Sequence, residues 1–217
     1  CWLDIPIDVQ SSQVDPAAMK GYDSHEDEEQ TSVSDLPQIC AEIVKKIITA
    51  KRPVILAGKG IRLAGAIELF DRVRKKLGIP VAAAWTGIDL IAYDDPLYAG
   101  CSADVGTRAG NFAVQNSDLL LILGTRMSLR QLTYNWKAFA RQAFKIHVDI
   151  DPAEFQKPMF ITDLPVACDL KDFLEELDRQ IDNAKYHSAH ADWVRWCTER
   201  VQKYPTLQAR HREFKGE

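Results

Sequence analysis

The amino-acid sequence predicts a three-layer α/β fold, in which a parallel β-sheet of five or six strands lies between layers of helices. Several short apolar runs, such as Val54-Ile55-Leu56 and the stretch 119–123, show no polar alternation, which indicates strands covered on both faces. These runs alternate with amphipathic helical segments. That alternation is typical of parallel strands joined by right-handed crossovers.

The expected elements follow one another regularly from residue 36. A helix is expected where apolar residues recur every three or four positions, and a strand where the apolar run is continuous. Ser34 can cap the first helix, and Gly78 ends the second. In order, the expected elements are helix 36–48, strand 53–57, helix 67–77, strand 79–84, helix 107–116, strand 119–123, strand 144–150, strand 164–167 and helix 170–181.

Both ends of the chain depart from this pattern. Residues 1–9 form an apolar run that predicts the end of a strand, and no start signal precedes it, so we expect a piece of a longer protein. Asp23–Asp35 holds six acidic residues without Lys or Arg, which indicates a solvated linker. A cation site there is the less favoured alternative, because the spacing differs from that of a calcium loop. From His187 we expect one helix with an apolar stripe, followed by a connector.

Composition and charge argue against several classes of function. The 217 residues are 46% hydrophobic and 27% charged, and a net charge of −4 gives no support for binding to nucleic acid or to anionic membranes. No apolar run approaches the roughly 20 residues that span a bilayer. The five cysteines are scattered without a CxxC pair. We therefore expect free, mostly buried thiols in a reducing cytoplasm, and neither disulfides nor a zinc site.

The first candidate binding residues follow the strand at 53–57. Ligands of open parallel sheets bind beyond the carboxyl ends of the strands, and Gly58-Lys59-Gly60 stands at such an end. Glycines there let backbone N–H groups approach a phosphate, and Lys59 adds a positive charge. The alternative is a tight strand-to-helix turn, because the triplet is only part of a GxGxxG motif.

Basic candidates follow the most hydrophobic strand. Gly124-Thr125-Arg126 comes directly after residues 119–123, and Arg130 lies four residues further on. Arginine can hold a phosphate with two parallel hydrogen bonds. The alternative is an arginine that forms only a surface ion pair.

Acidic candidates follow the next two strands. Asp149 and Ile150 end one strand, and the Asp149 carboxylate can accept hydrogen bonds from a ribose or an adenine amine. Asp151 is expected to cap a short helix that begins at Pro152. Asp169, after the last strand, admits both interpretations, a ligand contact and a helix cap.

Other catalytic patterns are missing from the sequence. It contains no HExxH, no cysteine-rich zinc spacing and no GxSxG. His187, His190 and Cys197 lie near one another on the last helix, but helical spacing places only some of them on one face, so a metal site is disfavoured. His147 lies inside an apolar strand, and we expect a core or interface histidine there, not a catalytic one.

Four segments of the sequence carry a family resemblance. They are residues 2–9 (WLDIPIDV), 52–60 (RPVILAGKG), 113–126 (AVQNSDLLLILGTR) and 146–154 (IHVDIDPAE). In their order and approximate spacing, they resemble the thiamine diphosphate-dependent enzymes of the acetolactate synthase type. The resemblance implies three regions: residues 1–35 end a pyrimidine-binding domain and add the acidic linker, residues 36–184 form the central domain, and residues 185–217 form a helical connector to a diphosphate-binding domain.

The resemblance also implies a fold, an activity and cofactors. The family's central domain has a six-stranded, Rossmann-like sheet of the sirtuin and electron-transfer flavoprotein type, and in acetolactate synthases it holds FAD. Thiamine diphosphate and Mg²⁺ belong to the flanking domains, where a 2-oxo acid is decarboxylated and joined to an acceptor. Full-length relatives form homodimers or homotetramers. The chain by itself is expected to be inactive and to hold no catalytic residue.

Candidate flavin contacts are carried over by position. Gly58 and Gly60, with Lys59 between them, match the family's glycine loop; Gly124, Thr125, Arg126 and Arg130 match a GxRxxxR-like stretch; Asp149 and Ile150 match a segment near the adenosine, and Asp169 matches a further aspartate. Two places depart from the synthase pattern, Ser128 in place of an aspartate and residues 101–104 in place of a methionine-histidine pair. The alternatives are the central domain of an FAD-free decarboxylase or lyase, an NAD-dependent enzyme on a similar sheet, and a non-enzymatic nucleotide-binding module.

Overall fold

The structure, a computed structural model, describes residues 2–23 and 35–208. The chain divides into two compact units, Cys1–Gln30 and Thr31–Glu217. Within the described part of the first unit, the regular element is a short helix, α1 (Ile7–Gln10), none of whose residues is buried. The predicted strand over residues 1–9 is therefore wrong. A strand needs a neighbouring strand for its backbone hydrogen bonds, and residues 2–23 contain no strand.

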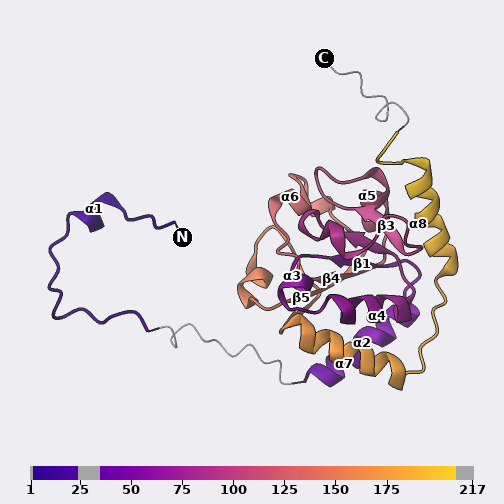
Figure 1. Cartoon of the computed structure of the whole chain (residues 1–217), viewed down its shortest axis with the longest axis horizontal. Helices are drawn as coiled ribbons and strands as arrows, with labels where there is room; N and C mark the ends of the chain where they lie inside the picture. Colours follow the sequence, from indigo (N-terminus) through magenta and orange to yellow (C-terminus); the bar gives the residue numbers. More distant parts are fainter. Residues whose placement is uncertain (1, 24–34, 209–217) are drawn as a thin grey trace, which may run out of the picture. The chain divides into compact units, whose positions relative to one another are not determined.

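The second unit is built around a six-stranded, parallel sheet with the strand order β3-β2-β1-β4-β5-β6 (Figure 1). The strands are β1 (Pro53–Ala57), β2 (Val81–Ala83), β3 (Tyr98–Cys101), β4 (Leu119–Leu123), β5 (Phe144–Asp149) and β6 (Leu164–Ala167). The chain begins in the middle at β1, runs outward to β3, and returns to β4 on the other side of β1. The connections therefore change direction between β1 and β4, where open parallel sheets bind ligands.

Helices cover both faces of this sheet. In Figure 1, α2 (Leu36–Thr49), α4 (Ile67–Leu77) and α7 (Leu170–Asn183) lie on one face, and α5 (Arg108–Gln115) lies on the other, flanked by α8 (Ala191–Lys203). Successive strand residues point into two separate apolar cores: Ile55 and Ala57 into the first, and Val54 and Leu56 into the second. This double burial explains why the strands show no polar alternation.

Several short elements connect the strands and the longer helices. They are α3 (Gly60–Leu63), α6 (Leu129–Leu132) and the 3₁₀ helices η2 (Trp85–Leu90), η3 (Trp136–Ala138) and η4 (Pro152–Gln156).

The ends of the longer helices follow local signals. Thr107 begins α5 by accepting a hydrogen bond from the Gly110 N–H (3.0 Å), and Gly78 ends α4 with a φ of 56°. Ser34, the expected cap of the first helix, lies outside the described residues, as does most of the predicted acidic linker. Asp35 occupies the N-cap position of α2, and its side chain makes no capping hydrogen bond.

Strand β3 was not predicted from the sequence, and two strands are shorter than expected. Residues 79–84 contribute only Val81–Ala83, and residues 144–150 only Phe144–Asp149. β3 is only four residues long, and Gly100, which has a φ of +114°, interrupts its apolar run. A Cβ on Gly100 would lie 2.5 Å from the Gly110 nitrogen, which shows how closely this edge strand packs against α5.

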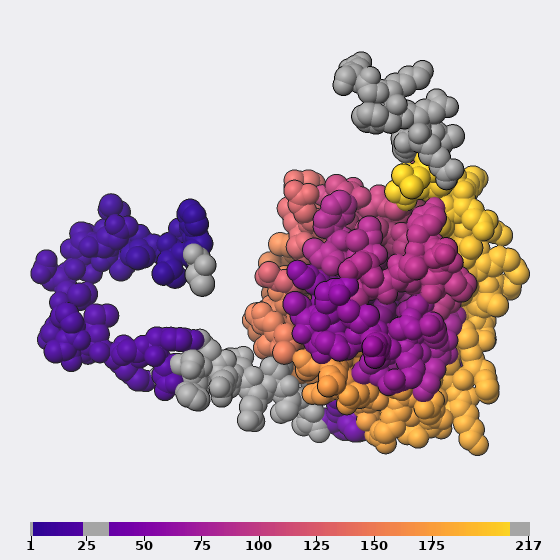
Figure 2. All heavy atoms as spheres, in the orientation of Figure 1, coloured from indigo at the N-terminus to yellow at the C-terminus, as the bar shows by residue number. Residues whose placement is uncertain are grey.

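Helix α8 packs onto the core of the second unit, as its yellow segment along one flank shows (Figure 2). Trp193 and Cys197 are buried against α5 and β3, and Trp193 Nε1 donates to the Pro53 carbonyl (3.0 Å). The expected domain boundary at residue 184 thus stays a prediction. The four described cysteines, Cys40, Cys101, Cys168 and Cys197, are free and buried, as expected. Among the described residues, no helix combines the length and the apolar character that crossing a membrane requires.

Candidate functional site

A cavity of about 910 Å³ lies at the carboxyl edge of the sheet. Its walls come from the segments that follow all six strands, including Lys59 after β1, Trp85 after β2, Ala103 after β3, Thr125 after β4, Ile150 after β5 and Asp169 after β6. Its volume falls within the range of roughly 300–1,000 Å³ that is typical of cofactor sites. The strand order and the cavity therefore point to the same edge of the sheet.

Nearly all of the predicted binding residues meet in this cavity. The predicted residues that line it are Lys59, Gly60, Gly124, Thr125, Arg126, Arg130, Asp149, Ile150 and Asp169. Gly58 is not among the lining residues. Residues separated by more than a hundred positions thus come together because the ends of parallel strands share one edge.

The glycines pack the end of β1 against the end of β4. Gly58 N donates to the Leu123 carbonyl (2.9 Å), and Gly60 N donates to the Gly124 carbonyl (3.1 Å). A Cβ on Gly60 would lie 2.6 Å from Gly124 Cα, and Gly124 itself has a φ of +57°. Contrary to expectation, the N–H groups of Gly58 and Gly60 are used within the fold and are not left for a phosphate. The tight strand-to-helix turn, the alternative, accounts for this loop.

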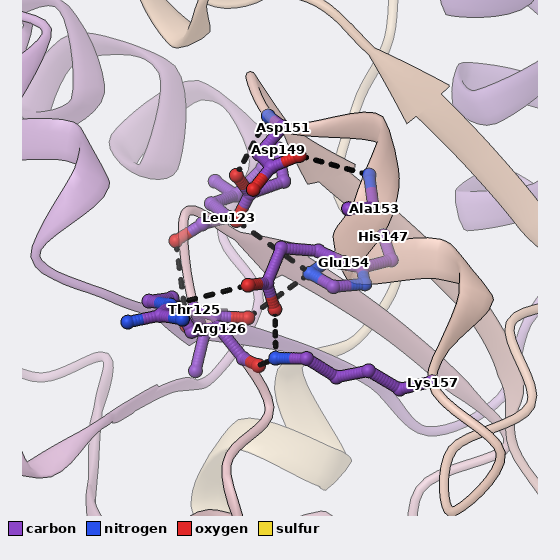
Figure 3. Close-up of polar contacts among 9 residues, drawn as sticks. All are labelled: Leu123, Thr125, Arg126, His147, Asp149, Asp151, Ala153, Glu154 and Lys157. Carbon is purple, nitrogen blue, oxygen red and sulfur yellow. Dashed lines mark hydrogen bonds and ion pairs between the residues drawn. The ribbon is translucent and has the colours of Figure 1, made fainter. Parts of the chain in front are cut away.

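Arg126 reaches from the end of β4 to a buried carboxylate on η4. Its Nε donates to Glu154 Oε1 (3.1 Å), and its side chain remains 81% exposed, whereas that of Glu154 is only 4% exposed. Lys157 binds Glu154 Oε2 from the other side and also donates from Nζ to the Arg126 carbonyl (2.6 Å). Figure 3 shows Glu154 between the two cations. Arg126 thus forms an ion pair, as in the alternative interpretation, and its side chain is still largely exposed.

His147 on β5 contacts the backbone of the loop that follows β4. Its ring is fully buried, packs edge-on against Phe155 and Phe160, and places Nε2 3.0 Å from the Thr125 carbonyl. Burial lowers the pKa of His147 to about 4, so the ring is neutral near pH 7 and Nε2–H donates to that carbonyl. His147 therefore has a structural role under the site, as expected.

Of the three aspartates that follow β5 and β6 in the cavity, two cap helices and the third, Asp149, is buried. Asp151 accepts from the Ala153 N–H (2.9 Å) and caps η4, as predicted, while Asp169 accepts from the Lys171 N–H (2.7 Å) and caps α7. Asp149 is 7% exposed, and burial, with a smaller contribution from Glu154, raises the pKa of its carboxyl group above the usual value. Asp149 caps no helix: its Oδ1 accepts from the Asp151 N–H (3.2 Å), and its Oδ2 accepts no hydrogen bond from the described residues.

The far side of the cavity joins the segments after β3 and β4. Arg130 Nη1 lies 4.0 Å from Asp104 Oδ2, and the Asp104 N–H donates to the Arg130 carbonyl (3.0 Å). The buried side chain of Gln131 donates to the Ser102 carbonyl (2.5 Å). Arg130 is held by its backbone, and its side chain, 81% exposed, is the second cation available to an anionic ligand.

The donor set of the cavity fits a dinucleotide and offers no metal centre. Two exposed guanidinium groups can hold a diphosphate, the buried Asp149 carboxylate can accept from hydroxyl or amine groups, and Trp85 and Val105 add apolar wall. No group of three or more His, Cys, Asp or Glu side chains that could hold a metal occurs in the described ranges 2–23 and 35–208.

Sequence reasoning missed several lining residues. Glu154 and Lys157 follow a proline turn, and no motif distinguishes them from surface charges. Trp85 lies on a 3₁₀ helix without periodicity, and Val105 follows the unpredicted β3. Only the spacing of charged residues over 149–157 could have indicated that Glu154 and Lys157 contact Arg126.

Comparisons with known proteins agree with this geometry. Residues 40–177 match the family model described as the thiamine pyrophosphate enzyme, central domain. A probable acetolactate synthase large subunit from Methanococcus aeolicus is 37% identical over 188 residues, which cover 83% of this chain and 30% of the relative. The acetolactate synthase large subunit of Lactococcus lactis is 30% identical over 207 residues, covering 94% of this chain and 34% of the relative.

A third relative shows the same pattern. The acetolactate synthase isozyme 2 large subunit of Escherichia coli is 32% identical over 157 residues, covering 71% of this chain and 27% of the relative. The chain thus spans about a third of the length of the curated relatives it matches.

Proposed function

The chain belongs to the family of thiamine pyrophosphate enzyme central domains. We propose that it is the FAD-binding central domain of an acetolactate synthase-type enzyme. The observation that carries the proposal is the cavity at the switch point of the sheet, where Arg126 and Arg130 leave exposed guanidinium groups beside the glycine-packed ends of β1 and β4. Such an edge is where parallel sheets of this order hold dinucleotides.

Each part of the cavity has a distinct task in this proposal. Arg126 and Arg130, with Lys59, hold the diphosphate of FAD, and their charges offset its two negative charges. Asp149 accepts hydrogen bonds from the ribose or the adenine amine. The apolar wall around Trp85 and Val105 excludes water from the flavin ring. In this family the bound FAD is largely without redox use. In the proposal, this chain's own side chains would hold it.

The whole protein's chemistry lies outside these residues in the same proposal. Thiamine diphosphate with Mg²⁺ supplies the carbanion chemistry of 2-oxo acid decarboxylation and carboligation, and its site belongs to the flanking domains. The central domain binds FAD and positions those neighbours. We further propose a cytoplasmic homodimer or homotetramer for the full-length enzyme, with a small 2-oxo acid as substrate.

A flavin titration of the purified 217-residue chain tests the proposal. FAD should bind, and binding should quench the flavin fluorescence. Arg126→Ala should weaken binding by about 10- to 100-fold, because it removes a charge-assisted hydrogen bond that contributes about 1.5–3 kcal/mol. Arg179→Ala is the matched control, because Arg179 is an exposed arginine paired with Glu176 on α7 and does not line the cavity. Absence of FAD binding by the wild-type chain would contradict the proposal and favour a flavin-free decarboxylase or lyase.

A further inference from the structure

The carboxylate of Glu154 is buried at a place where an anionic ligand is expected. Its side chain is 4% exposed, lines the cavity, and is in contact with two cations, Arg126 and Lys157. Removing a carboxylate from water costs several kcal/mol unless cations and hydrogen bonds compensate it. Placing an acid beside a phosphate site would by itself weaken anion binding, so its presence calls for a compensating role.

The geometry of the Arg126 guanidinium suggests that role. Only Nε is used by Glu154, and no hydrogen bond joins the two terminal nitrogens to any residue in the described ranges. An arginine held by its Nε edge keeps two donors in one plane, which is the arrangement that a phosphate accepts. An unheld arginine with an 81% exposed side chain would lose more rotamer freedom on binding a ligand.

The backbone of the same loop is held from the same side. Lys157 Nζ binds the Arg126 carbonyl (2.6 Å), and His147 Nε2 binds the Thr125 carbonyl (3.0 Å). The next residue, Met127, is fully buried with a φ of 44°, a left-handed conformation that costs a non-glycine residue free energy. Two carbonyl anchors therefore precede a strained residue, as Figure 3 shows for Thr125 and Arg126.

We propose that Glu154 and Lys157 are positioning residues, which hold Arg126 by its Nε and its carbonyl so that its terminal nitrogens stay available for the phosphate groups of the ligand in the cavity. The proposal rests on the proposed function for the identity of the ligand, and on the contacts of Glu154 for the positioning itself. Glu154 acts through Arg126 and makes no contact with the ligand of its own.

The effect of Glu154→Gln on FAD affinity distinguishes positioning from simple electrostatics, because the two predict changes of opposite sign. Removing a negative charge from the cavity should strengthen FAD binding if only the summed charge matters. If Glu154 positions Arg126, the substitution should weaken FAD binding by about three- to tenfold, since one charge-assisted hydrogen bond becomes neutral. Glu176→Gln, which removes the partner of Arg179 on α7, should leave FAD affinity unchanged.

A double-mutant cycle tests whether Glu154 acts through Arg126. The Glu154→Gln substitution made in an Arg126→Ala background should change FAD affinity by less than about twofold, because the group to be positioned is gone. Additive losses, or unchanged or tighter binding by Glu154→Gln alone, would overturn the proposal.

Hydrogen exchange in the wild-type chain tests the positioning without any ligand, and it remains informative if Glu154→Gln does not fold. In the NMR spectrum of the wild-type chain, the Arg126 Nε–H, assigned from its loss in Arg126→Lys, should exchange with water more slowly than that of Arg130, whose side chain is equally exposed. Equal exchange rates would overturn the positioning proposal whatever FAD does. Slow exchange at Arg126 without FAD binding would support the positioning and contradict only the proposed function.

Discussion

At the scale of single residues, charge and burial decide what each polar side chain of the cavity does. Arg126 is 81% exposed and still paired, Glu154 is buried between two cations, and His147 is buried and neutral. Residue type alone would rank Arg126 and His147 as equally plausible ligand contacts. Their exposure separates them, because a fully buried ring whose Nε2 donates to a carbonyl has no route to a ligand.

The buried His147 makes stability depend on pH. Its pKa is about 4 in the folded chain, below the value of about 6.5 in an unfolded chain, so the unfolded state binds more protons between these values. Stability should therefore fall as pH falls from about 6.5 towards 4, and His147 should account for about 2 kcal/mol of the loss between pH 7 and pH 4.5.

Urea unfolding of His147→Gln at the two pH values checks this dependence. The glutamine amide can still donate to the Thr125 carbonyl but does not titrate, so the variant should lose about 2 kcal/mol less than the wild-type chain between pH 7 and pH 4.5. His187→Gln is the control, because that side chain is exposed and should follow the wild-type curve. The same pH dependence in wild type and His147→Gln would contradict the assignment.

At the scale of elements, the close approach of the β1–α3 turn to the end of β4 shapes the site. Gly60 and Gly124 touch without side chains between them, and the hydrogen bonds from Gly58 and Gly60 tie the two strand ends together. The cavity opens beside this contact. The glycines therefore act through packing, and in the proposed function the charged side chains around them are the groups that contact the ligand.

Gly60→Ala should be strongly destabilising. The added Cβ would lie 2.6 Å from Gly124 Cα, so backbone must move, and we expect a loss of about 3 kcal/mol in unfolding free energy. Gly65→Ala is the matched control: its φ is +64°, but the space around it is open, so it should cost only about 1 kcal/mol. Thermal unfolding of both variants measures the difference, and equal losses would show that the contact between the loops is not tight.

At the scale of the whole second unit, α8 packs into the hydrophobic core, although the sequence predicted that residues 185–217 form a connector. Trp193 is 7% exposed, stacks on Trp196 and donates to the Pro53 carbonyl at the start of β1. His190 Nε2 lies 3.0 Å from the Ala50 carbonyl nearby. The segment after residue 184 is therefore joined to the amino edge of the sheet, opposite the cavity.

Trp193→Ala should destabilise the chain by about 3–5 kcal/mol, because it leaves a cavity and an unpaired carbonyl beside β1. Trp2→Ala is the control, since Trp2 is 89% exposed and its replacement should change stability by less than about 0.5 kcal/mol. Guanidinium unfolding gives both values. A Trp193→Ala variant as stable as the wild-type chain would show that α8 is only a connector.

The amino-acid sequence alone contains the layered fold and most of the candidate site. Continuous apolar runs identify β1, β2 and β4 because both faces of these strands are buried. Strand-end residues such as Gly124 and Arg126 fall in the cavity because parallel strands end at one edge. These properties are local or follow from a general rule of topology. They can therefore be inferred before any contact is known.

Only the tertiary structure decided the pairings across the chain. It added β3, whose Gly100 interrupts the apolar pattern; it placed helix α1 where a strand was expected; and it brought Glu154 and Lys157 to Arg126. A short edge strand depends on its neighbour for hydrogen bonds, and a buried carboxylate depends on its cations. Neither dependence leaves a periodic signal in the sequence, because the partners are distant along the chain and meet only when the sheet has formed.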